Sequence, residues 1–177
     1  MKLMFLHGLE GSPQGNKARY LRTKYQVAAP ALDTSAIRAW LSSASAKDRV
    51  PRSLVQPTLT QLATLLQSNA PEVLVGSSYG GALALLLAAE GLWQGPMILM
   101  APAVFRFSLA PFEHPAPVVI LHGLHDEIVP IDSSRQWSQV LGTQSHLIEL
   151  DDDHRLQKSI PENEEFEKAL NLVRTTH

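Results

Sequence analysis

Cysteine is absent from the 177-residue chain. The absence excludes disulfides, thiolate zinc sites and cysteine nucleophiles, and it indicates the redox compartment only weakly. Long apolar runs are missing too: the longest is interrupted at Glu90, short of the roughly 18 residues that cross a bilayer. Only four apolar residues, Leu3 to Leu6, follow the N-terminal lysine, too few for the core of a signal peptide. We therefore expect a cytoplasmic protein with no membrane partner.

The chain also lacks an excess of basic charge. It has 15 lysines and arginines against 17 aspartates and glutamates, and no basic run with interleaved aromatic residues. No nucleic-acid partner is therefore expected. The hydrophobic fraction, 45%, suits a globular protein, and the length fits a single domain over residues 1–177 with a sizeable core. The oligomeric state is left open.

Short apolar runs alternate with segments of helical period, which indicates βαβ units. The strand candidates are Leu3–Leu6, Gln26–Ala29, Val73–Val75, Met97–Met100, Val118–Leu121 and His146–Leu150. The helix candidates are Asn16–Tyr25, a short segment around Ile37 to Ala44, Ser53 to about Gln67, Tyr79–Glu90, Ser133–Leu141 and a last helix from Ser159.

Helix starts are predicted from capping residues. We expect capping boxes at Ser53 and Ser159, and a cap at Asp132. Pro57 and Pro161 then fall in first turns, where the amide hydrogen that proline lacks has no partner anyway.

Near-continuous apolar strands predict a sheet that is covered on both faces. With right-handed crossovers, the fold class is α/β: a three-layer α/β/α sandwich around a doubly wound, mostly parallel six-stranded sheet. The segment from Pro102 to Pro117 is a proline-rich loop, too short to fold as a lid domain. We therefore expect an open site lined by loops.

Polar residues follow several of the predicted strands, at the sheet edge where ligands collect. The third strand leads into Gly76-Ser77-Ser78-Tyr79-Gly80, which matches G-x-S-x-G only with Ser78 at its centre. In such an elbow the central hydroxyl stands beside a helix N-terminus, which favours developing negative charge. We predict Ser78 as the nucleophile and Ser77 as part of the supporting turn. The alternative is a turn that only caps the helix.

A serine hydroxyl needs a base, and the base needs a third group to orient it. The order Ser, Asp, His is available as Ser78, Asp126 and His154, because Asp126 follows the fifth predicted strand and His154 the sixth. The alternatives are a surface histidine and a turn-capping carboxylate. Asp153 is a weaker acid candidate, since a side chain adjacent to His154 generally cannot turn back to its ring. Glu127 is weaker too.

Acyl transfer also requires two amide donors for the tetrahedral oxyanion. Tyr79, the residue after the nucleophile, is predicted to supply one N–H. Leu9, in the loop HGLEGSPQG after the first strand, is predicted to supply the other. The alternative for this loop is a glycine-rich turn before a helix.

No cofactor and no metal is expected. The segment from Gly11 to Lys17 fails the spacing of a phosphate loop, and no dinucleotide-binding G-x-G-x-x-G is present. His122, His125 and Asp126 do not have the spacing of metal ligands. We assign His7, His122 and His125 to packing or loop stabilisation.

The segments FLHGLEGSPQGNKARYL, VGSSYGG, HGLHDEIVP and DDDHRL resemble the α/β-hydrolase superfamily and, more narrowly, the small YqiA-like esterases. The resemblance covers essentially the whole chain. It implies a compact, nearly lidless domain that acts on short-chain acyl esters, with the nucleophile, base, acid and amide donors named above. It also implies that the antiparallel hairpin at the start of larger hydrolases is missing. The acidic pair Asp151-Asp152 departs from such esterases, which often have glycine there.

Together these observations predict a serine hydrolase of the carboxylesterase type, whose partner is a small-molecule acyl ester. His154 deprotonates Ser78, an acyl-enzyme forms, and water releases the acid. A thioesterase or another acyl hydrolase with the same triad is an alternative, and so is a module that binds or signals without turnover. Candidates for an acyl pocket or for the core are Trp93, Phe105, Phe107 and Phe112.

Overall fold

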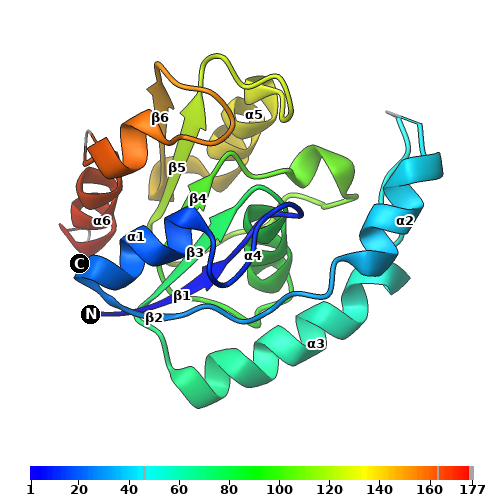
Figure 1. Cartoon of the computed structure of the whole chain (residues 1–177), viewed down its shortest axis with the longest axis horizontal. Helices are drawn as coiled ribbons and strands as arrows, with labels where there is room; N and C mark the ends of the chain where they lie inside the picture. The colour runs from blue at the N-terminus through cyan, green and yellow to red at the C-terminus, as the bar shows by residue number, and fades with distance from the viewer. Residues whose placement is uncertain (46, 163, 176–177) are drawn as a thin grey trace.

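The computed structural model describes residues 1–45, 47–162 and 164–175. Its centre is a six-stranded, all-parallel sheet with strand order β2-β1-β3-β4-β5-β6 (Figure 1). The strands are β1 (Lys2–Leu6), β2 (Gln26–Ala28), β3 (Val73–Ser77), β4 (Met97–Met100), β5 (Val118–Gly123) and β6 (Ser145–Leu150). The ends of all six lie within two residues of the predicted ranges, so the six strand predictions are confirmed.

Helices cover both faces of this sheet (Figure 1). One core lies between the sheet and the helices α1 (Asn16–Lys24) and α6 (Glu165–Thr175). The other core lies between the sheet and the helices α2 (Ser35–Ser43), α3 (Arg52–Asn69), α4 (Tyr79–Ala89) and α5 (Ile131–Leu141). The architecture is therefore the predicted three-layer α/β/α sandwich.

Successive residues of a strand serve the two cores in turn. In β1, Leu3 and Phe5 belong to the core beneath α1 and α6, whereas Met4 and Leu6 belong to the opposite core. This alternation follows from the pleat, which points successive side chains to opposite faces. Because both faces are covered, nearly every position of β1 is apolar, as a buried parallel strand requires.

The capping residues predicted for α3 and α5 are wrong. α3 and α5 each follow a proline, Pro51 and Pro130, which occupies the N-cap position without a side-chain hydrogen bond. The proline ring fixes the backbone before the first helical residue, so no side-chain cap is needed to set the start. Ser53 and Asp132 consequently lie inside the first turn. Pro57 therefore lies in the second turn of α3 and not in its first turn as predicted.

The helix predicted from Ser159 begins later, at Glu165. Lys158–Glu162 instead form a π-helical turn that contains Pro161. The backbone N–H of Ser159 donates to the Asp152 carboxylate at 2.8 Å, so this turn is bonded to the segment that follows β6. That tertiary bond replaces the predicted capping box.

The connection from β4 to β5 is a loop, as predicted. Residues 101–117 contain only a short 3-10 helix, η1 (Val104–Arg106). Within the parts of the chain that the structure describes, none of the helices combines the length and the hydropathy that a membrane span requires.

Candidate active site

Ser78 occupies a sharp turn between β3 and α4. Its backbone has φ 55° and ψ −114°, a strained conformation for a residue that carries a Cβ. Its N–H donates to the Met100 carbonyl at 2.8 Å, and its carbonyl accepts from the Ala82 N–H at 3.1 Å, so neighbouring backbone holds the turn. Ser78 is half-buried, whereas Ser77 is buried. The turn therefore leaves Ser78, of the two serines, within reach of a substrate.

Glycine flanks this turn because nothing larger fits. A Cβ on Gly76 would lie 2.5 Å from the Gly80 carbonyl oxygen, and a Cβ on Gly80 would lie 2.0 Å from the Leu6 carbonyl oxygen. Both distances are far below van der Waals contact. The two glycines of the G-x-S-x-G pattern therefore allow α4 to start directly against β1 and β3.

Ser78, His154 and Asp126 come together from the ends of three strands, β3, β6 and β5. Ser78 Oγ lies 3.2 Å from His154 Nε2, and His154 Nδ1 lies 2.7 Å from Asp126 Oδ2. An ionised carboxylate can only accept, so the proton of a neutral His154 sits on Nδ1 and leaves Nε2 as the acceptor for the Ser78 hydroxyl. The arrangement can transfer a proton from Ser78 to His154.

The Asp126 carboxylate is buried among hydrogen-bond donors. Oδ1 accepts from the backbone N–H groups of Ile128 and Val129, each at 2.8 Å, and Oδ2 faces His154 and, at 3.2 Å, His122 Nε2. Burial alone raises the pKa of Asp126, but these hydrogen bonds outweigh it and hold the pKa well below its usual value. Asp126 therefore remains ionised behind His154.

The acidic residues before His154 accept backbone hydrogen bonds within the loop that carries it. Asp152 accepts from the backbone N–H groups of Asp153 and Ser159, both at 2.8 Å. Asp153 accepts from the backbone N–H of Arg155 at 2.7 Å. The carboxylate of Asp153 is thus hydrogen-bonded to the backbone of its own turn. Glu127, the other acid weighed from the sequence, is exposed.

The loop that carries Leu9 passes directly beside the Ser78 side chain. A Cβ on Gly8 would lie 3.2 Å from Ser78 Cβ and 3.8 Å from its Oγ. Among the described residues, the backbone N–H groups of Leu9 and Tyr79 have no hydrogen-bond acceptor. Two free N–H groups next to a hydroxyl meet the chemical requirement of an oxyanion site, and that of Tyr79 also lies at the positive end of α4.

Two side chains fix the backbone around Leu9. His7 Nε2 accepts from the Leu32 N–H at 3.3 Å, so Nδ1 carries the proton that is donated to the Gly8 carbonyl at 2.8 Å. That carbonyl and the Leu9 N–H belong to one planar peptide, so the bond sets the direction of the N–H. Arg38 of α2 donates to the Leu9 carbonyl. The loop-stabilising role assigned to His7 agrees with this geometry, whereas a single exposed arginine on a helix gave no signal in the sequence.

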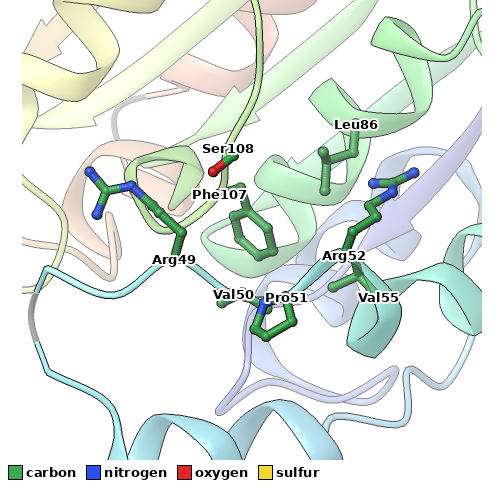
Figure 2. A pocket seen from close by; sticks show the side chains of 8 residues that line it. All are labelled: Arg49, Val50, Pro51, Arg52, Val55, Leu86, Phe107 and Ser108. Atoms are coloured by element: carbon green, nitrogen blue, oxygen red, sulfur yellow. The ribbon is translucent and has the colours of Figure 1, made fainter.

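A cavity of about 210 Å³ lies where residues 49–55 meet Leu86 of α4 and residues 107–108. Its lining, shown in Figure 2, consists of Arg49, Val50, Pro51, Arg52, Val55, Leu86, Phe107 and Ser108. Phe107 lies at the centre of this lining and stacks on Tyr79, with ring centroids 6.2 Å apart. Burial raises the pKa of the Tyr79 phenol to about 12, so its side chain stays neutral and serves as packing.

The other aromatic candidates for an acyl pocket have different neighbours. Phe112 packs on Trp137, Trp93 donates to the Pro96 carbonyl at 3.3 Å, and Phe105 lies under the Arg106 guanidinium. Phe107 is therefore the one of the four that lines the cavity of Figure 2.

Metal-ligating side chains do not converge in the described ranges: no group of three or more His, Cys, Asp or Glu residues is placed to hold an ion. His125 instead contacts Asp151 at 2.8 Å on the surface. His122 is buried, with Nδ1 2.7 Å from the Ser134 hydroxyl.

Comparison with known proteins agrees with this architecture. The model of an uncharacterised protein family, UPF0227, matches residues 2–112. No match is found among curated proteins.

Three solved structures illustrate the fold. A serine hydrolase without a lid from Xanthomonas campestris is 22% identical, with a TM-score of 0.64 over 97% of this chain and 81% of that one. Est1E from Butyrivibrio proteoclasticus is 16% identical, with a TM-score of 0.67 over 98% and 88%. A monoacylglycerol lipase from Paleococcus ferrophilus is 13% identical, with a TM-score of 0.69 over 98% and 94%. At these identities the likeness establishes the fold, which is that of the α/β-hydrolases.

Proposed function

Because this chain belongs to the UPF0227 family and has the α/β-hydrolase fold, we propose that it is a serine hydrolase that cleaves small acyl esters. The observation that carries the proposal is the hydrogen-bonded series Ser78–His154–Asp126, with 3.2 Å and 2.7 Å between the successive atoms. A series of this kind, next to two free backbone N–H groups, supplies each group that acyl transfer requires.

In the first half of the proposed reaction, His154 Nε2 takes the proton of Ser78 as Oγ attacks the ester carbonyl. The carbonyl oxygen becomes an oxyanion, and the N–H groups of Leu9 and Tyr79 donate to it. His154 then gives its proton to the departing alcohol, which leaves an acyl group on Ser78. In the second half, His154 takes a proton from water, the hydroxide attacks the acyl group, and the acid is released as Ser78 regains its proton.

Asp126 acts through His154 in this proposal. Its ionised carboxylate holds the proton of His154 on Nδ1 and stabilises the imidazolium that forms during each attack. Burial and the surrounding donors support this role, because they keep the negative charge in place and exclude water from it.

The proposed substrates are esters of short acyl chains. The site lies at the open edge of the sheet, and the connection from β4 to β5 supplies only a short 3-10 helix to cover it. A long acyl chain needs an extended apolar cover to leave water, and residues 101–117 do not form one.

Labelling with a fluorophosphonate probe tests this function without a known substrate. We expect the wild-type protein to be labelled and the Ser78→Ala variant to be unlabelled. Ser77→Ala is the matched control, because it removes the neighbouring hydroxyl and should still be labelled. Labelling that survives Ser78→Ala would overturn the assignment of the nucleophile. No labelling of folded wild-type protein would favour a module that binds without turnover.

A further inference from the structure

His122 is a second histidine in contact with the Asp126 carboxylate. It is fully buried, and it lies in β5 four residues before Asp126. Its Nε2 lies 3.0 Å from the Val129 carbonyl oxygen and 3.2 Å from Asp126 Oδ2. Its Nδ1 lies 2.7 Å from the Ser134 hydroxyl, which is buried in α5.

These partners determine where the proton of His122 lies. A carbonyl and an ionised carboxylate can only accept, so Nε2 carries the hydrogen, which it donates to the Val129 carbonyl within contact distance of Asp126. In the neutral ring, Nδ1 is then an acceptor, and the Ser134 hydroxyl donates to it. Each polar atom of the buried imidazole is thereby satisfied, as a buried polar group requires.

The position of the His122 Nε2–H determines how the Asp126 carboxylate is held. Both oxygens of Asp126 then have partners: Oδ1 accepts from two backbone N–H groups, and Oδ2 contacts both His154 and His122. The Val129 residue whose carbonyl faces His122 also donates its own N–H to Asp126. His122 therefore contacts both the Asp126 carboxylate and the turn that surrounds it, and the bond to Ser134 connects these groups to α5.

We propose that His122 is a positioning residue for Asp126: its Nε2–H, oriented by Ser134, fixes the carboxylate at the distance that His154 needs. The proposal rests on the proposed function for its catalytic consequence. It extends the series of contacts to Ser78–His154–Asp126–His122–Ser134, drawn from the turn after β3, the loop after β6, β5 with the turn that follows it, and α5.

The test is a double-mutant cycle measured as the rate of fluorophosphonate labelling. His122→Leu removes the N–H at similar size, and we expect labelling to slow about tenfold or more, as for loss of a hydrogen bond to a charged group. His122→Gln keeps an N–H donor near the same position and should recover most of the rate. In an Asp126→Asn background, His122→Leu should slow labelling by less than about twofold, because residues that act as a unit are not additive.

Two outcomes of the cycle would overturn the proposal. One is a wild-type labelling rate in folded His122→Leu. The other is a His122→Leu variant whose labelling rate falls by the same factor with Asp126 and in the Asp126→Asn background. That result is expected of a merely structural residue. Unlabelled wild-type protein would instead count against the proposed function.

A second measurement needs no variant and no activity. Nitrogen NMR of the histidine rings in the wild-type protein reports which nitrogen carries the proton. The proposal requires the Nε2–H form for His122. A Nδ1–H form would overturn it even if every His122 variant failed to fold, and the result does not depend on whether the protein is a hydrolase.

Discussion

Gly123 and Asp152 are in such close contact that a Cβ on Gly123 would lie 2.4 Å from the Asp152 carbonyl oxygen. The Asp153 carbonyl oxygen would be 2.6 Å from the same Cβ. The last residue of β5 therefore meets the segment before His154 with no room for a side chain. The placement of the proposed base depends on this contact as much as on its own hydrogen bonds.

Gly123→Ala should consequently push the His154 loop away from Ser78. We expect a cost of about 1–3 kcal/mol in the free energy of unfolding. We also expect a fall of roughly 100-fold in the labelling rate, the size of effect seen when a group moves by about 1 Å. Urea titration and fluorophosphonate labelling measure the two effects. Gly142→Ala is the control, because Gly142 follows α5 at a positive φ of 64°, so the substitution should cost stability although its Cβ would have no atom within 4 Å. Equal labelling rates in the two variants would contradict the prediction.

Esterase activity should fall as acidification protonates His154. A protonated imidazole cannot accept the Ser78 proton, so the first step stops. The measurement is the rate of p-nitrophenyl acetate hydrolysis as the pH is lowered from about 8 to about 5. A rate that is flat over this range would argue against His154 as the base.

Asp126→Asn should lower stability at neutral pH, and the deficit should shrink in acid. The pKa of Asp126 is lowered on folding, so its ionised form stabilises the folded state at any pH above the unfolded value of about 3.9. That contribution is lost as the pH falls from there through the folded pKa. Urea unfolding at neutral pH and at steps below about pH 4 measures the difference between variant and wild type.

Asp132→Asn is the matched control for this experiment. Its carboxylate is 85% exposed and pairs with Arg135 at the surface, so its removal should change stability little at any pH. If the deficit of Asp126→Asn grew as the pH fell, the sign of the linkage would be wrong.

Short acyl chains should be preferred over long ones. We expect p-nitrophenyl acetate and butyrate to be hydrolysed with higher kcat/KM than esters of much longer acids, because residues 101–117 form no extended cover. A series of p-nitrophenyl esters that differ only in acyl length tests this directly. A maximum at dodecanoyl or a longer chain would refute it.

The sequence predicted the sheet and the proximity of Ser78, His154 and Asp126 for the same physical reason. Parallel strands covered on both faces must be apolar, so Val73 or Val118 marks a strand, and polar residues that follow such strands must gather at one edge. The glycine spacing around Ser78 was equally informative, because the turn leaves no space for a Cβ at Gly76 or Gly80.

Features that depend on contacts between distant segments could not be predicted in this way. The π-helical turn at Ser159 depends on a bond to Asp152, and the contact of Arg38 with Leu9 joins α2 to another loop. The start of α3 was predicted from the capping pattern at Ser53, whereas the folded backbone begins the helix directly after Pro51. From the sequence, His122 was assigned to packing or loop stabilisation. Its contact with Asp126 becomes visible only when β5 and α5 are placed together.

The order of the strands also places Ser78 and His154 in regions of unequal local stability. β3, which leads to Ser78, lies inside the sheet and is buried along its whole length. β6, which leads to His154, is an edge strand whose side chains are mostly half-buried or exposed. Edge elements open at lower free energy than the core. Gentle heating should therefore separate the proposed base from the proposed nucleophile while the rest of the sheet stays folded. Inactivation would then report the local unfolding of the β6 edge, long before the whole molecule unfolds.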